Sequence, residues 1–169
     1  MPASRATSAQ PDGDLDPARF AYLTPTADDR AACLGRLVAL SRTLSERSAG
    51  WDQLIRFDPI QRWRYRLELD EPDGYQAWLL SWLPGQGTEL HDHGAAPAVF
   101  TVLRGQLEEC ATSPFDGRPR RQLVVAGQLR YWAPRHLRQL SNPGSAPAVS
   151  LHVYQVDGPE SAITQVGEM

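Results

Sequence analysis

The apolar positions of this chain follow two different patterns, which change near residue 62. Between residues 27 and 47 they recur about every 3.6 residues, the spacing of one face of an α-helix. Thr24-Pro25-Thr26 precedes this segment and Gly50 follows it, so boundary signals stand at both ends. We therefore predict a helix over residues 27–47, followed by a shorter helical turn over residues 51–57. The apolar residues of the longer helix are Leu34, Leu37, Val38, Leu40 and Leu44.

Short runs of β-forming residues separated by turn signals make up the rest of the chain. Turns are expected at Pro72-Asp73-Gly74 and at residues 113–117. Many short strands at this spacing are typical of a β-sandwich or barrel. The expected fold class is mainly β, a sandwich or barrel with a small N-terminal helical portion outside it. Strands are predicted over residues 75–82, 98–103, 106–111, 122–125, 129–132, 137–140 and 148–155.

Length and composition fit one soluble globular domain. The chain has 169 residues, and we expect a flexible tail over residues 1–20 and a single domain over residues 21–169. A net charge of −3 and scattered arginines predict no nucleic-acid partner, and the absence of a long apolar run predicts no membrane span. Cys33 and Cys110 form no redox motif, so a cytoplasmic location is expected.

The four histidines carry the first chemical signal, because all of them fall in the predicted β-region. His91 and His93 are two residues apart, and on an extended strand such side chains project from the same face. Both rings can then reach one metal ion. Pairs at this spacing also occur on ordinary surfaces, so the pair alone leaves that interpretation open.

The residues around this pair resemble the first motif of the cupin superfamily. That motif runs glycine, five residues, His-x-His, a short gap, glutamate, six residues, glycine. Gly85, His91-Asp92-His93 and Gly105 match its frame, while Ala98 stands where the glutamate ligand would be. The usual fourth protein ligand is therefore missing.

A third ligand is expected from a second motif near a glycine and a proline. His136 follows Gly127 and Pro134, and we predict that it completes the site; the alternative is a surface histidine flanked by arginines. Ferrous iron accepts imidazole ligands in six-coordinate geometry, so three histidines would leave positions for a chelating substrate and dioxygen. Three neutral ligands would also leave the full charge of the ion, which favours an anionic ligand such as a thiolate.

The last predicted strand has two distinct faces. Val149, Leu151 and Val153 lie on one face, and Ser150, His152 and Tyr154 lie on the other. If the polar face points inward, its groups must satisfy one another by hydrogen bonding. The alternative is a polar stripe that faces solvent.

Residues 84–94, from Pro84 to Gly94, together with residues 150–154, resemble the cysteine dioxygenase family, and in particular its bacterial-type members. The resemblance implies Fe(2+) held by His91, His93 and His136. It also implies a relay of Ser150, His152 and Tyr154 that directs the phenol toward the substrate. An arginine on an early strand would bind the substrate carboxylate; Arg66 matches that position by its distance to Trp82, with Arg64 as the competitor on the same face.

The implied reaction is the conversion of L-cysteine and O2 to cysteine sulfinic acid. A dioxygenase of 3-mercaptopropionate or another small thiol is the nearest alternative, although relatives with that preference typically carry glutamine in place of the arginine. A non-catalytic metal- or ligand-binding cupin is a further alternative, as is a zinc or manganese hydrolase or isomerase. No tyrosine crosslink is expected, because Ala98 occupies the position of the crosslinking cysteine of animal members. We expect a monomer or weak homo-oligomer.

Overall fold

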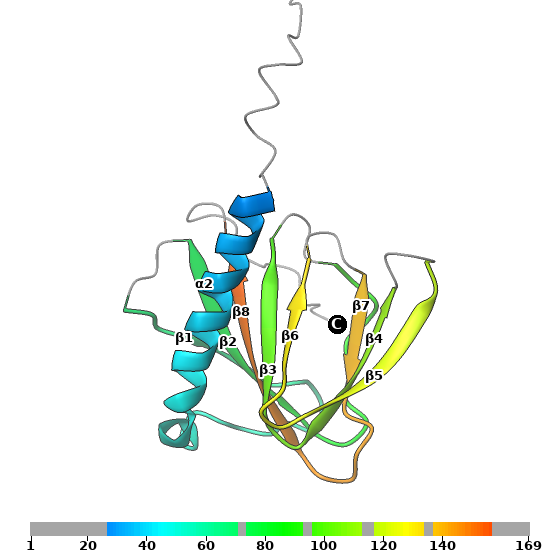
Figure 1. Ribbon diagram of the computed structural model, residues 1–169. Coiled ribbons are helices and arrows are strands. Elements are labelled where there is room, and N and C mark those ends of the chain that lie inside the picture. The colour runs from blue at the N-terminus through cyan, green and yellow to red at the C-terminus, as the bar shows by residue number, and fades with distance from the viewer. Residues whose placement is uncertain (1–26, 71–73, 93–95, 113–116, 134–136, 157–169) are drawn as a thin grey trace, which may run out of the picture. The chain divides into compact units, whose positions relative to one another are not determined.

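The computed structural model describes residues 27–70, 74–92, 96–112, 117–133 and 137–156 (Figure 1). The chain divides into two units, Met1–Ala32 and Cys33–Met169. The described part of the first unit is the start of helix α2 (Ala27–Glu46), and the second unit contains the rest of that helix and the strands. The predicted tail, residues 1–20, and the predicted start of the domain at residue 21 lie outside the described residues.

The predicted helix matches α2 to within one residue. Its buried residues are Leu37, Ser41 and Leu44, which recur at helical spacing and form one face. The shorter turn lies earlier than expected, as the 3-10 helix η1 (Ser48–Trp51). Neither helix in the described part of the chain has the length and apolar character needed to span a membrane.

Two antiparallel sheets form the β-region. The five-stranded sheet has the order β1-β2-β8-β3-β6, and the three-stranded sheet has the order β5-β4-β7. The expectation of a mainly β sandwich with an N-terminal helix is confirmed. The strands are β1 (Arg64–Leu67), β2 (Tyr75–Trp82), β3 (Ala98–Arg104), β4 (Gln106–Thr112), β5 (Pro119–Val125), β6 (Leu129–Trp132), β7 (Arg138–Ser141) and β8 (Ala148–Gln155).

Gly105 is the single residue between β3 and β4, and the chain passes there from the larger sheet to the smaller one. Its φ of +73° is in the left-handed region, and an added Cβ would lie 2.9 Å from the carbonyl oxygen of Pro147. Glycine is therefore required at this crossing for both conformational and steric reasons.

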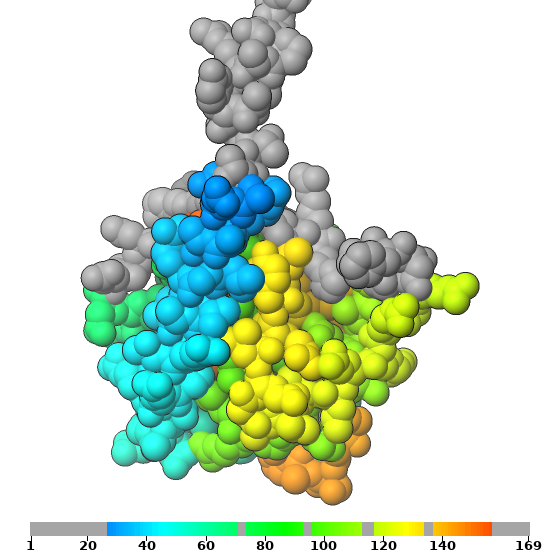
Figure 2. Space-filling view, viewed as in Figure 1, coloured from blue at the N-terminus to red at the C-terminus, as the bar shows by residue number. Residues whose placement is uncertain are grey.

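Strand β8 separates two hydrophobic cores. Leu151 and Val153 pack with Leu37 and Leu44 of α2, so the odd-numbered residues of β8 face the helix. Ala148 and Tyr154 belong to a second core that includes residues of both sheets, so the even-numbered residues face the space between the sheets. Figure 2 shows the atoms of α2 from Cys33 onward packed closely on the neighbouring strands.

This arrangement decides the orientation of the polar face of β8. Ser150, His152 and Tyr154 are 0%, 2% and 4% exposed, respectively, so the stripe does not face solvent. The apolar residues of the same strand pack against the helix. Because side chains alternate along a strand, the three polar side chains then point to the opposite face, between the sheets. The three polar side chains therefore lie in the space between the sheets.

Candidate metal and substrate site

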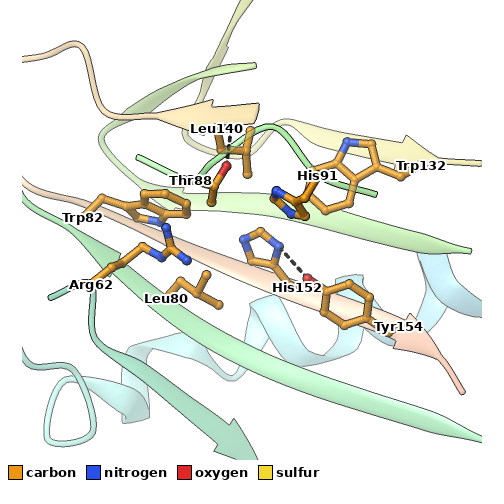
Figure 3. Close-up of a pocket in the computed structure, with 9 residues that line it drawn as sticks. All are labelled: Arg62, Leu80, Trp82, Thr88, His91, Trp132, Leu140, His152 and Tyr154. Atoms are coloured by element: carbon orange, nitrogen blue, oxygen red, sulfur yellow. Dashed lines mark hydrogen bonds between the residues drawn. The ribbon is translucent and has the colours of Figure 1, made fainter. Parts of the chain in front are cut away.

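A small pocket lies between the sheets, at the inward face of β8 (Figure 3). Most of its apolar walls come from the inter-sheet core, and its polar groups come from several separate segments. The lining residues are Arg62, Leu80, Trp82, Thr88, His91, Trp132, Leu140, His152 and Tyr154.

A chain of hydrogen bonds leads along β8 to Tyr154. The Trp82 indole Nε1 donates to Ser150 Oγ at 2.9 Å, and Ser150 Oγ lies 2.8 Å from His152 Nε2. His152 Nδ1 lies 3.4 Å from the Tyr154 hydroxyl oxygen. Figure 3 shows the last of these bonds, with the imidazole and the phenol both at the pocket. The structure thus brings together all three predicted relay residues and adds Trp82 to them.

The direction of proton donation follows from the chemistry of the donors. An indole N–H can only donate, so Ser150 Oγ accepts from Trp82 and has its own proton to give. His152 Nε2 is the acceptor for that proton within the described residues, which leaves the imidazole proton on Nδ1. Nδ1–H then donates to the Tyr154 oxygen. The phenol oxygen thus accepts a hydrogen bond from the imidazole at the wall of the pocket.

Burial keeps the imidazole and the phenol of this chain uncharged. Burial, reinforced by the positive charges of Arg138 and Arg62, holds the pKa of His152 well below its usual range. Burial also raises the pKa of Tyr154 to about 12. At neutral pH the imidazole is neutral and the phenol retains its proton, as the hydrogen-bond direction requires.

The lowered pKa of His152 predicts a pH-dependent stability. The unfolded chain takes up a proton at this histidine as pH falls below about 6.5, whereas the folded chain does not, so the free energy of unfolding decreases. The slope from one group is at most about 1.4 kcal/mol per pH unit. We expect His152→Gln to lose less stability than the native protein between pH 7 and pH 5, measured by urea unfolding. Tyr154→Phe, which retains the imidazole, should keep the native slope; equal slopes in all three proteins would contradict the prediction.

His91 lines the pocket from the segment that follows β2. Its Nδ1 donates to the Glu89 carbonyl oxygen at 2.7 Å, which places the lone pair of a neutral ring on Nε2. Burial lowers the pKa of His91, which favours that neutral form. Metal-binding histidines commonly donate their second nitrogen to a carbonyl in this way. The ring therefore fits the role of a metal ligand.

In its described part, the segment that carries the histidine pair forms a single bridge, between His91 and Arg138. The backbone N–H of each residue donates to the carbonyl oxygen of the other, at 3.0 and 2.9 Å. These bonds fix the backbone of His91 beside β7. The other two predicted ligands, His93 and His136, lie outside the described residues.

No acidic side chain lines the pocket among the described residues. Ala98, which stands in place of the glutamate ligand, is fully buried and lies across from Tyr154 in the β3–β8 pairing. A ligand with negative charge would therefore meet no repelling carboxylate from this lining.

The three arginines that precede or begin β1 lie at different distances from the pocket. Arg66 is exposed and pairs across the sheet with Trp78. Arg64 is also exposed, with its guanidinium 5.8 Å from the Trp78 ring. Arg62 lines the pocket: its guanidinium lies 4.5 Å from the Trp82 ring, and one terminal nitrogen donates to the Gly87 carbonyl oxygen at 2.9 Å.

Arg62 was not among the site residues predicted from the sequence. Its Nε is buried and has no hydrogen-bond partner within the described residues, and burial lowers its pKa. The three arginines share one face because they are two residues apart. The cross-strand register distinguishes them: Arg64 lies opposite Leu80, and Arg62, two residues earlier, comes beside Trp82 and contacts its ring.

A mainly β sandwich with a histidine in a pocket between its two antiparallel sheets defines a protein of the cupin, or double-stranded β-helix, class. A Klebsiella pneumoniae protein with a double-stranded β-helix domain is similar in structure, with a TM-score of 0.52 at 20% identity over 62% of this chain and 84% of that one. Recombinant oxalate oxidase in complex with glycolate gives a TM-score of 0.52 at 17% identity, over 60% of this chain and 54% of that one.

The family follows from the sequence comparison. Residues 26–164 match the model of the cysteine dioxygenase type I family, and the chain belongs to that family. Cysteine dioxygenase type 1 of Danio rerio is 32% identical over 115 residues, which are 62% of this chain and 56% of the relative. The matched region thus spans a little over half of that relative's length.

Proposed function

We propose that this protein is a thiol dioxygenase that uses Fe(2+) held by His91, His93 and His136. Its reaction would add both atoms of O2 to the sulfur of a small thiol carboxylate, in the first place L-cysteine, and yield the sulfinic acid. The observation that carries the proposal is the hydrogen-bond chain from Trp82 through Ser150 and His152 to Tyr154, which ends in the same pocket as His91. A site that only binds a ligand has no need for a phenol oriented in this way.

Bound iron would supply the redox chemistry that joins dioxygen to a thiolate. The chain's own contribution is to bind, orient and donate a proton. Tyr154 would hydrogen-bond to the bound reactants, His152 would orient the phenol, and Ser150 with Trp82 would hold the imidazole in one tautomer. Fixing the reactants in one orientation removes much of the entropic barrier to their reaction.

Loss of the phenol hydroxyl should slow turnover without loss of metal. A positioned proton donor contributes about 10²-fold or more to a rate, so we expect Tyr154→Phe to lower the turnover number by about that factor. Oxygen uptake of the iron-loaded protein measures the rate, and metal analysis measures the iron content. Tyr65→Phe, on an exposed residue of β1, is the matched control and should retain full activity. Unchanged turnover in Tyr154→Phe would overturn the relay.

Two arginines are candidates for the substrate carboxylate. The family resemblance assigns Arg66 to this role, whereas the pocket geometry favours Arg62. A guanidinium binds a carboxylate through two parallel hydrogen bonds, and the buried Nε of Arg62 belongs to such a group. We therefore propose Arg62 as the first candidate and retain Arg66 as the second.

A 3-mercaptopropionate dioxygenase is the second candidate function. The described pocket lining offers no carboxylate for the ammonium group of cysteine, and this favours a thiol without an amine. Oxygen uptake by the iron-loaded protein with L-cysteine, 3-mercaptopropionate and cysteamine tests both candidates. No thiol-dependent uptake with any of them would leave the non-catalytic cupin as the better interpretation.

A further inference from the structure

Trp82 contacts two polar groups of the pocket at once, the guanidinium of Arg62 and the hydroxyl of Ser150. It ends β2, its side chain is fully buried, and it belongs to the core between the sheets. Its carbonyl oxygen accepts a hydrogen bond from Asn142 Nδ2 at 3.1 Å, which ties this end of the strand to the residue after β7. Close packing and a fixed backbone leave the ring little room to turn.

The face of the indole ring carries the guanidinium of Arg62. The central carbon of that group lies 4.5 Å from the ring centre, within the range of a cation–π contact (Figure 3). One terminal nitrogen also donates to the Gly87 carbonyl oxygen at 2.9 Å. Arg62 precedes β1, so strand pairing alone does not place its side chain. The indole face is therefore a seat that holds the guanidinium at the pocket wall.

The edge of the same ring provides the first donor of the relay. The indole N–H can donate but cannot accept, and Ser150 Oγ receives it at 2.9 Å. A hydroxyl that accepts one hydrogen bond becomes a stronger donor of its own proton, because hydrogen bonds in a chain polarise one another. Trp82 therefore favours donation from Ser150 to His152 Nε2, 2.8 Å away, and with it the Nδ1–H tautomer of the imidazole.

The opposite direction is the one that the phenol favours by its own chemistry. A phenol O–H is more acidic than the N–H of a neutral imidazole, so Tyr154 would otherwise be the donor to His152 Nδ1. The imidazole would then carry its proton on Nε2 and donate to Ser150. Each nitrogen of a neutral imidazole either donates or accepts, so the two directions exclude each other. The indole N–H at the far end is the fixed donor that favours the first.

We infer that Trp82 is a positioning residue with two separable parts: its ring face seats the guanidinium of Arg62, and its N–H sets the tautomer of His152. The tautomer decides what Tyr154 presents to a ligand, because a phenol that accepts from Nδ1 keeps its own proton for the ligand. The seat and the tautomer are properties of the protein without metal or substrate. Their consequence for turnover rests on the proposed function.

Nitrogen-15 NMR of the full-length chain, labelled in histidine and arginine, reads both parts without turnover. The ring-nitrogen signals of His152, assigned by their absence in His152→Gln, report the ratio of the two tautomers. The Nε–H signal of Arg62, assigned by its absence in Arg62→Gln, is displaced by the ring current of an aromatic ring beneath it. The Nε–H signal of the exposed Arg66 is the undisplaced reference.

The two parts should respond to different variants. Trp82→Phe keeps an aromatic face but lacks the N–H, so we expect the ratio of the Nδ1–H to the Nε2–H tautomer to fall at least threefold while the Arg62 signal stays displaced. Ser150→Ala breaks the chain beyond the indole and should give the same pair of results. Trp82→Leu removes both parts and should also move the Arg62 signal to the Arg66 reference; Trp82→Met replaces it if it does not fold.

Trp78→Phe is the matched control. Trp78 lies on the same strand and packs against the same core, and its indole N–H donates to Gln76 Oε1 at 3.4 Å, outside the relay. This variant loses an indole N–H of the same kind, so it should leave the tautomer ratio and the Arg62 signal as in the native protein. Thermal melting verifies that each variant is folded.

The inference is overturned if Trp82→Phe leaves the tautomer ratio of His152 unchanged, if Trp78→Phe changes it as much, or if the native Arg62 signal coincides with that of Arg66. Its failure is distinguishable from failure of the proposed function. A tautomer that follows the indole N–H, with no oxygen uptake on any thiol, would support the inference and refute the dioxygenase. Oxygen uptake with a tautomer that ignores the indole would do the reverse.

Discussion

The iron content of the His91→Ala variant should fall to background. Its thiol-dependent oxygen uptake should fall as well. The imidazole lines the pocket in the neutral form that a metal requires, with its second nitrogen fixed by the Glu89 carbonyl. Removal of one of the three proposed protein ligands would leave too few donors to retain the ion. The measurements are metal analysis after reconstitution and desalting, together with oxygen uptake on L-cysteine and 3-mercaptopropionate.

The variant should fold, because the bonds that tie this segment to β7 come from the backbone of His91 and Arg138. Thermal melting checks this point. Tyr154→Phe is the matched comparison, since it should keep its iron while losing rate. Stoichiometric iron in a folded His91→Ala protein would show that the metal site lies elsewhere.

Arg62→Gln should raise the KM for thiols that carry a carboxylate by about 10- to 150-fold. A hydrogen bond to a charged group contributes about 1.5–3 kcal/mol, and this range corresponds to that factor. Glutamine retains much of the length of arginine but removes the charge and the paired donors. The KM for cysteamine, which lacks a carboxylate, should change by less than threefold. Steady-state oxygen uptake with both substrates measures the two effects.

Arg66→Gln is the control that decides between the two arginines. Its side chain is exposed on β1, and we expect both KM values to stay near those of the native protein. A large effect on cysteine in Arg66→Gln, with none in Arg62→Gln, would return the carboxylate-binding role to Arg66. Equal effects of Arg62→Gln on cysteine and cysteamine would indicate a structural role for Arg62.

The position of Ala98 has a consequence for the tyrosine of the relay. Ala98 lies across from Tyr154 in the sheet, and an alanine side chain cannot form the cysteine–tyrosine crosslink that the family resemblance brings into question. The Tyr154 hydroxyl is therefore positioned by its hydrogen bond to His152 and by the packing of the buried ring. The Trp82–Ser150 bond adds a fixed donor at the far end of the same chain, which strengthens the preference for one tautomer of His152.

The sequence predicted the elements whose patterns are strong. Helical periodicity predicted α2 to within one residue, and β2, β6 and β8 have the predicted bounds. Strand β7 begins one residue later than expected and β5 begins three residues earlier, at Pro119. Strand β1 had no predicted bounds, although Trp63, Tyr65 and Leu67 alternate with Arg64 and Arg66. The hydrophobic pattern of the sequence predicts the ends of strands, and strands at the edge of a sheet, least well.

The sequence alone determined which side chains share a face. Alternation along β8 requires that Ser150, His152 and Tyr154 lie together, and the same rule groups Arg62, Arg64 and Arg66. Alternation is symmetric, however, and does not say which face points inward. The tertiary structure decided this, because α2 covers the Leu151 side of β8 and leaves the His152 side for the interior.

Only the tertiary structure also decided which arginines reach the pocket. Arg62 does so because the β1–β2 register sets it near Trp82, whereas Arg138 is buried on the same face of β7 as Leu140 and lies against the pocket-lining Trp132. Both relations join segments that are far apart in the chain. Pairing register and the packing of distant elements are determined by the whole core, and no local run of residues contains that information.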